Sequence, residues 1–314
     1  MPDFPATPTG PTRPDPRGLP APYVGLVDDA AIFPPGNSPL DAAVTAWHER
    51  RDEPWSSLVG CFVVSDQRLP ELGDAIDAAG LTDDRPLPVS VVVGGGAGAV
   101  APAASSARRM RGVRLVGVEV ALRDPDDLFG NARRVVTAVD QARDHGAIDD
   151  DVTVHVELPQ GPTTHGWLAA ADEVAAAELR LKYRTGGVDA DRFPSVDDLA
   201  SWIDAALDRE TPFKCTAGLH NAVRHTDPET GFTHHGFLNV LAATRAALDG
   251  GDVRAVLDER DGPALAAALP DLDTLARTRR WFMSFGSCSV LEPLQDLVTL
   301  GLVPDPDPRT NQES

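Results

Sequence analysis

Residues 152–187 read VTVHVELPQGPTTHGWLAAADEVAAAELRLKYRTGG. Apolar and polar residues alternate in Val152–Leu158 and again in Glu178–Tyr183, which is the period of a β-strand. The alanine- and leucine-rich segment between them, at 165–176, has helical spacing. The stretch therefore predicts a strand–helix–strand unit, the repeating element of parallel α/β folds.

The same unit recurs along the chain. We predict strands at Tyr23–Val27, Leu58–Val64, Leu87–Val93, Val113–Ala121, Val152–Leu158, Glu178–Tyr183, Pro212–Thr216 and Trp281–Phe285. We predict helices at 39–51, 68–79, 102–111, 125–145, 165–176, 195–208, 236–249 and 290–300. Such a count predicts a single (β/α)8 TIM-type barrel, with an open doubly wound sheet as the alternative. Residues 252–280 exceed one unit, so we expect one or two helices inserted before strand eight.

The length and composition of the chain limit how many domains it can form and which kinds of partner it can bind. In this chain of 314 residues we expect disordered proline-rich tails at 1–22 and 304–314 around a barrel at 23–303. The net charge of -20 argues against a nucleic-acid partner, and no apolar run has the roughly 18 residues that a membrane span needs. The three cysteines lack C-x-x-C spacing, which indicates reduced thiols and a cytoplasmic location. A homo-oligomer is compatible with this composition.

The chain has two lysines, Lys182 and Lys214, on the predicted sixth and seventh strands. Alternation turns Lys182 and Arg184 inward, and it places Lys214 and Thr216 on one face, near the strand ends where such barrels carry their active sites. A buried lysine can become a neutral nucleophile, whereas arginine keeps its charge. Two neighbouring ammonium groups repel, which should lower the pKa of one of them. The alternative is that both lysines clamp an anion or form structural ion pairs.

This pair resembles the lysine pair of class I aldolase barrels of the deoxyribose-phosphate aldolase type. The run Lys214-Cys215-Thr216-Ala217-Gly218 matches the K-x-[ST]-x-G pattern of that family. The resemblance implies a Schiff base on Lys182 and a pKa-lowering role for Lys214. The chain departs from the pattern at Arg184, at Glu119 in place of the strand-four aspartate, and at Gly286-Ser287-Cys288-Ser289 in place of a Gly-Gly phosphate loop.

Nearly the whole chain also resembles a family of bacterial proteins whose activity is uncharacterised. The shared segments are AAIFPPG (30–36), KYRTGG (182–187), KCTAGLH (214–220), HGFLN (235–239) and FGSCSVLEP (285–293). This resemblance implies one coherent domain and brings no activity with it.

Histidines form a second group. Four of the eight lie between 217 and 235, after the seventh strand, and a turn at Asp227–Gly231 should fold this long loop back over the barrel mouth. The fifth strand directs His155 and Glu157 inward. We expect no cofactor, and the alternative is a divalent metal such as zinc held by His220, His235 and Glu157.

Glycine-rich turns add anion-binding candidates. Gly186 and Gly187 after strand six, and Gly286 and Ser287 after strand eight, could present backbone N–H groups to an anion, or could be ordinary turns. The run Gly96–Ala101 matches G-x-G-x-x-A, with Glu119 some twenty residues further on, so a dinucleotide site is a weaker alternative.

We interpret the chain as a lyase-like enzyme that acts on a small anionic carbonyl compound, a sugar phosphate or keto acid, through a lysine imine. The alternatives are a metal-dependent lyase or hydrolase and a non-catalytic barrel that binds a small anion. The expected catalytic residues are Lys182, Lys214, Glu157, Glu119 and His220. The expected substrate-binding residues are Arg184, Gly186, Gly187, Thr216, His235, Gly286 and Ser287.

Overall fold

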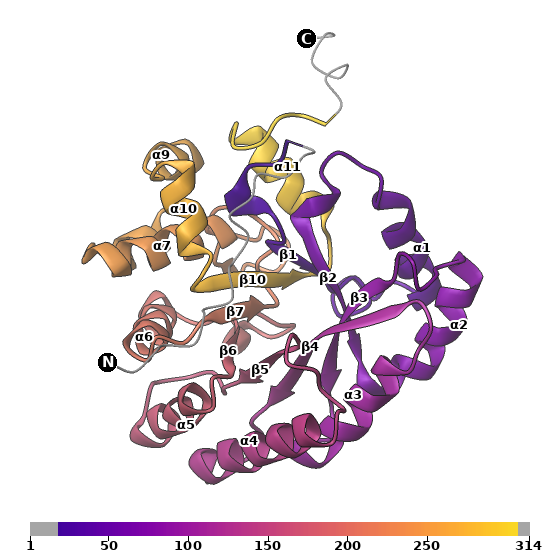
Figure 1. The fold of residues 1–314 in the computed structure, drawn as a ribbon. Coiled ribbons are helices and arrows are strands. Elements are labelled where there is room, and N and C mark those ends of the chain that lie inside the picture. Colours follow the sequence, from indigo (N-terminus) through magenta and orange to yellow (C-terminus); the bar gives the residue numbers. More distant parts are fainter. Residues whose placement is uncertain (1–17, 307–314) are drawn as a thin grey trace, which may run out of the picture.

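The computed structural model describes residues 18–306. Eight parallel strands close into a barrel in the order β1-β10-β7-β6-β5-β4-β3-β2 (Figure 1), which confirms the (β/α)8 prediction and excludes the open sheet. Their bounds are β1 Val27–Asp29, β2 Val59–Ser65, β3 Leu87–Val93, β4 Val113–Ala121, β5 Thr153–Glu157, β6 Arg180–Arg184, β7 Phe213–Thr216 and β10 Phe282–Ser287.

A helix follows each barrel strand and covers the outside of the barrel (Figure 1). These helices are α1 Leu40–Arg50, α2 Leu69–Ala79, α3 Val100–Arg108, α4 Leu128–Asp144, α5 His165–Ala176, α6 Val196–Asp208, α7 Phe237–Asp249 and α11 Leu291–Thr299. Short 3-10 turns lie at η1 Ala21–Tyr23, η2 Ser56–Leu58, η3 Asp66–Arg68, η4 Ala97–Ala99 and η5 Ala190–Arg192. No helix of residues 18–306 is long and apolar enough to cross a membrane.

The predicted insertion before the last barrel strand is present, with three short helices instead of one or two. They are α8 Val253–Asp258, α9 Gly262–Ala267 and α10 Leu272–Thr278. Asp252, Asp261 and Asp271 each accept a hydrogen bond from a backbone N–H in the first turn of the helix that follows. Aspartate N-caps therefore start each helix, and they explain why the segment divides into three pieces.

The first barrel strand begins later than its sequence indicated. The predicted range Tyr23–Val27 contains the end of η1 and Gly25, whose φ of 60° turns the chain, and β1 starts at Val27. Leu19 is buried, so the predicted domain boundary at residue 22 falls within a packed segment. Residues 1–17 and 307–314 of the two predicted tails lie outside the described residues.

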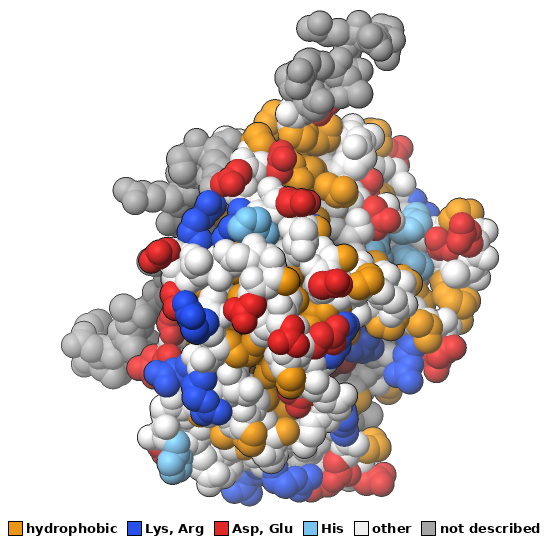
Figure 2. Space-filling model, turned by 90° about the vertical axis from the view of Figure 1, so that its right-hand side faces the viewer, with side chains coloured by type: hydrophobic (Ala, Val, Ile, Leu, Met, Phe, Trp, Pro, Cys, Tyr) orange, Lys and Arg blue, Asp and Glu red, His pale blue; other side chains and the backbone are white. Residues whose placement is uncertain are grey.

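The long loop after β7 folds back as expected. Two short strands, β8 His225–Thr226 and β9 Thr233–His234, pair antiparallel with His225 opposite His234. The Asp227 carboxylate accepts hydrogen bonds from the backbone of Glu229 and Thr230 and so holds the turn between them. On the face shown in Figure 2, acidic side chains are spread among arginines and apolar residues.

Candidate functional site

The two lysines meet inside the barrel at one carboxylate. Lys182 of β6 and Lys214 of β7 are direct register partners. The Nζ of Lys182 lies 2.8 Å from Oε2 of Glu119, and the Nζ of Lys214 lies 2.8 Å from Oε1 of the same residue. All three side chains are buried. Glu119, on β4, thus bridges both ammonium groups.

Each lysine has a second acidic partner. Glu157 of β5 places Oε2 2.8 Å from Lys182, and Asp28 of β1 places Oδ2 2.6 Å from Lys214. Arg184 donates from Nε to Oε1 of Glu157 at 2.9 Å. These contacts make a continuous series of alternating charges, the ion chain, which runs Arg184, Glu157, Lys182, Glu119, Lys214 and Asp28. Three cations and three carboxylates balance, so the ion chain is formally neutral.

Polar side chains of the remaining barrel strands complete the hydrogen bonding. Ser90 of β3 donates to Oε1 of Glu119 at 2.8 Å, and Ser284 of β10 donates to Oδ2 of Asp28 at 2.6 Å. The Cys61 thiol of β2 points to Oδ1 of Asp28 at 3.2 Å. All eight barrel strands therefore contribute a side chain to this one assembly.

Sequence reasoning missed four members of the assembly. They are Asp28, Cys61, Ser90 and Ser284. Two signals were available for them: an Asp-Asp pair directly follows the first predicted strand, and a serine interrupts the apolar run LPVSVVV of β3. A polar residue inside a buried strand indicates a partner within the barrel.

The carboxylates set the charge state of the lysines. Burial lowers the pKa of Lys182, but Glu119 and Glu157 outweigh it and the net shift is upward. Asp28 and Glu119 likewise raise the pKa of Lys214 against its burial. Burial raises the pKa of Glu119, yet Lys182 and Lys214 hold it well below its usual range. The expectation that repulsion lowers the pKa of one lysine is therefore wrong for this structure, because a shared carboxylate lies between them.

A cavity of about 620 Å³ opens above the ion chain. The expected site residues that line it are Lys182, Lys214, Glu119, Arg184, Gly186, Gly187, Thr216, His220 and Gly286. Glu157, Ser287 and His235 do not line it. The cavity thus lies at the C-terminal ends of the strands, where this fold carries its active sites.

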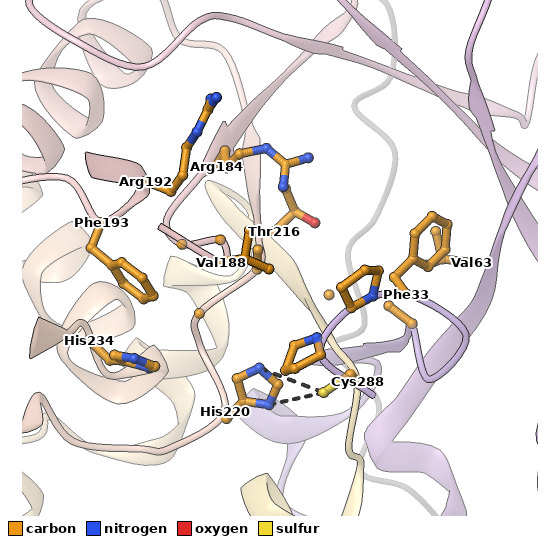
Figure 3. A pocket seen from close by; sticks show the side chains of 18 of the residues that line it. Phe33, Val63, Arg184, Val188, Arg192, Phe193, Thr216, His220, His234 and Cys288 are labelled. Atoms are coloured by element: carbon orange, nitrogen blue, oxygen red, sulfur yellow. Dashed lines mark hydrogen bonds between the residues drawn. The ribbon is translucent and has the colours of Figure 1, made fainter. Parts of the chain in front are cut away.

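Aromatic, histidine and arginine side chains surround the cavity (Figure 3). Phe193 stacks on His234 at 4.4 Å between ring centroids, and Phe33 lies across from them. Arg184 and Arg192 lie along another side. A deep ionic floor beneath a partly apolar rim is the arrangement typical of small-molecule sites.

Close packing explains the glycines after β6. A Cβ on Gly186 would lie 2.7 Å from Cα of Gly218, and a Cβ on Gly187 would lie 2.7 Å from Cβ of Arg192. The loops after β6 and β7 therefore touch through their backbones. Gly286 is less tightly packed: a Cβ there would lie 3.3 Å from the side-chain Oγ1 of Thr216. A role for these glycines in binding an anion stays a prediction.

The proposed metal ligands His220, His235 and Glu157 do not come together. His235 is buried with Nε2 2.9 Å from the carbonyl oxygen of Pro194, and burial and Arg224 lower its pKa to about 4. Glu157 belongs to the ion chain. Within residues 18–306 no group of three or more His, Cys, Asp or Glu side chains is arranged to hold a metal ion.

His155 lies inside the barrel, as its place on the fifth strand predicted. Both ring nitrogens of His155 are buried without a hydrogen-bond partner, and burial together with Lys214 lowers its pKa to about 3. His155 therefore lies inside the barrel as a neutral ring.

The run Gly96–Ala101 leads through η4 into α3 within the closed barrel, and Glu119 binds the two lysines. The dinucleotide interpretation is therefore wrong.

The fold is similar to that of a tetrameric deoxyribose phosphate aldolase from Aeropyrum pernix. The similarity covers 91% of this chain and 93% of that chain, with a TM-score of 0.49 and 11% sequence identity. No protein family model and no curated protein sequence matches the chain. The expected membership of a bacterial family therefore stays a prediction.

Proposed function

We propose that this barrel is an enzyme acting on a small anionic carbonyl compound, a sugar phosphate or keto acid, in an aldolase-type lyase reaction through an imine on Lys182. The observation that carries the proposal is the position of its amine. Lys182 lines the cavity, and its Nζ lies 2.8 Å from both Glu119 and Glu157. A primary amine in a cavity with proton acceptors beside it has the parts needed for covalent catalysis.

A structural role alone explains the ion chain poorly. Taking charged groups out of water is expensive, and buried ion pairs are often no better for stability than apolar side chains of similar volume. Six linked charges at the end of the barrel that carries active sites, below an open cavity, therefore favour a chemical role.

Imine formation is compatible with the raised pKa of Lys182. The ammonium first transfers a proton to Glu119 or Glu157, and the free amine then attacks the carbonyl carbon. A second N–H proton moves to the carbonyl oxygen, the carboxylic acid gives its proton to the resulting hydroxyl, which leaves as water, and a protonated imine remains beside the restored carboxylate. The positive charge at Nζ is the same before and after, so the two carboxylates that stabilise the ammonium also stabilise the imine.

Other residues of the cavity take supporting roles in this proposal. Lys214 holds Glu119 in place from the opposite side. Glu119 or His220, both of which line the cavity, exchanges protons with the bound carbon skeleton. Because the ion chain is neutral, the negative group of the substrate needs further donors. The partly exposed guanidinium of Arg184 has N–H groups beyond the Nε that binds Glu157, and Arg192 lies on the same side of the cavity.

Borohydride trapping tests the proposal. The protein is incubated with a panel of short aldehydes and keto acids, reduced with borohydride, and measured by intact mass and peptide mapping. We expect a stable adduct on Lys182, lost in Lys182→Met and formed more slowly in Lys214→Met. Absence of an adduct on either lysine across the panel would contradict the imine.

The second candidate function is a non-catalytic barrel that binds a small anion. The observation that favours it is the complete pairing of both ammonium groups with carboxylates. It predicts that an anionic ligand raises the melting temperature of the wild type and of Lys182→Met alike, with no turnover and no reducible adduct.

A further inference from the structure

A thiol and an imidazole face each other on the wall of the cavity, away from the ion chain. The Sγ of Cys288 lies 3.6 Å from Nδ1 and 3.8 Å from Nε2 of His220 (Figure 3). Glu292 places Oε2 3.2 Å from Nδ1 of the same ring. A nucleophile, a base and a carboxylate thus lie together, with Cys288 and His220 on loops and Glu292 in the first turn of α11.

The loops that follow β1, β7 and β10 build this arrangement. Gly36 belongs to the first loop, His220 to the second, and Cys288 to the third. A Cβ on Gly36 would lie 2.9 Å from Cβ of Cys288 and 2.8 Å from the carbonyl oxygen of Ala31, so only glycine fits there. The close contact fixes the thiol against the cavity wall. Three segments that stood out in the sequence, 30–36, 214–220 and 285–293, meet at this point.

Cys288 differs from the other two cysteines in its surroundings. Cys61 and Cys215 are buried, whereas Cys288 is half-buried and lines the cavity. Burial raises the pKa of the Cys288 thiol, an effect that the backbone N–H of Gly36 partly opposes. The thiol therefore stays protonated near neutral pH and needs a base to react, and His220 lies where such a base is required.

We propose that Cys288, His220 and Glu292 form a second carbonyl-reactive site, at which the thiol adds reversibly to an aldehyde bound in the cavity. The choice of an aldehyde rests on the proposed function, because the same cavity holds Lys182 and the two arginines that would attract an anionic carbonyl compound. The nucleophilic character of Cys288 rests on its own geometry and does not depend on the lysines.

The step balances without an oxidant or a cofactor. With Nδ1–H donated to Glu292, Nε2 of His220, 3.8 Å from Sγ, accepts the S–H proton while the sulfur attacks the carbonyl carbon, so that the S–C bond forms and the C=O π bond breaks. His220 then donates the proton to the resulting alkoxide and gives a neutral hemithioacetal. Glu292 accepts a hydrogen bond from Nδ1 and holds the imidazole in its orientation. The reverse path releases the aldehyde unchanged.

Alkylation of the intact full-length protein with iodoacetamide, followed by peptide mass spectrometry, tests the activated thiol. We expect Cys288 to react at least about tenfold faster than Cys61 and Cys215. His220→Gln should slow Cys288 by about 10- to 100-fold, because it removes the base. His225→Gln is the matched control: His225 also lines the cavity but contacts His234 and the Val223 carbonyl, so its substitution should leave the rate unchanged.

Protection by glyoxylate, a short aldehyde with a carboxylate, tests the chemistry. Glyoxylate should slow the alkylation of Cys288, and glycolate, which has a similar size and charge but no aldehyde group, should slow it much less. Protection should persist in Lys182→Met, and borohydride should leave no mass on Cys288, so this proposal and the lysine imine fail separately. Equal protection by both compounds, or a rate unchanged in His220→Gln, overturns the thiol site.

Discussion

Glu119→Gln is the most direct test of the ion chain. The substitution keeps the shape of the side chain and removes the charge that both lysines share. Lys182 and Lys214 lose a carboxylate 2.8 Å from each Nζ, and the Ser90 hydroxyl loses its charged acceptor. The new amide also turns one N–H group toward an ammonium or the hydroxyl, so at least one contact becomes a clash between donors.

The size of the effect follows from the remaining partners. Breaking a buried ion pair by removing one member destabilises a protein by about 3–5 kcal/mol. Each lysine keeps a second carboxylate, Glu157 for Lys182 and Asp28 for Lys214, so we expect the lower end, about 3 kcal/mol. That is a large part of a typical stability of about 5–15 kcal/mol, but the variant should still fold. At about 2 °C per kcal/mol for a chain of this size, its melting temperature should fall by about 6 °C.

Urea unfolding at several pH values separates charge from packing. The folded pKa of Glu119 lies well below its ordinary value of 4.5, because the two lysines outweigh its burial. A depressed carboxyl pKa gives stability that is present above the unfolded pKa and lost as the pH falls through the folded value. The difference in unfolding free energy between wild type and variant should therefore be constant near neutral pH and shrink below about pH 4.5.

Ser90→Ala is the matched control, because it removes one neutral donor from the same carboxylate. Ser90→Ala should lower the free energy of unfolding by about 1 kcal/mol, with little dependence on pH. If the Glu119→Gln difference is the same at acidic and neutral pH, repacking rather than charge causes it, and the electrostatic reasoning is refuted.

Three further predictions concern other parts of the barrel. Arg279→Ala should lower the unfolding free energy in urea by about 3 kcal/mol or more, because its buried guanidinium donates to backbone carbonyls at the start of the chain and on β10. Gly186→Ala should push the loop away from Gly218 and weaken ligand binding measured by calorimetry, whereas Gly98→Ala, with open space around its Cβ, should not. His155→Leu should flatten the loss of stability between pH 6.5 and 3 in urea titrations, because the wild-type pKa of about 3 makes that stability disappear as the pH falls below the unfolded value.

Periodicity alone predicted the barrel, because each strand and helix repeats its own pattern. The inward direction of Lys182 and Lys214 followed from the same alternation, and their pairing in register follows from adjacent parallel strands. Sequence patterns did not predict the start of a strand where the backbone conformation of one residue sets it. Gly25 turns the chain before β1, so the predicted first strand ended at Val27 and Asp28 escaped notice.

The charge state of the two lysines could not be predicted from the sequence pattern of their own strands, for a different reason. It depends on which carboxylates of β1, β4 and β5 reach the barrel centre, and strand register sets that. Alternation suggested an inward direction for Glu157, and the aldolase resemblance drew attention to Glu119, but neither indicated that Glu119 would lie between the two ammonium groups. The contact of Cys288 with His220 depends on two loops after neighbouring strands, which no sequence spacing encodes.

The balance of the ion chain restricts the chemistry that it can support. Three cations and three carboxylates share a buried space. A reaction that left Lys182 permanently neutral would leave Glu119 and Glu157 with negative charge that Lys182 no longer balances, which is costly in free energy inside the barrel. A reaction that restores a cation at Nζ avoids this cost, and a protonated imine is such a cation. A bound anion adds negative charge to the site, and this further stabilises a positively charged nitrogen at Lys182. The same electrostatics that keep the lysine protonated at rest are therefore compatible with the imine that we propose.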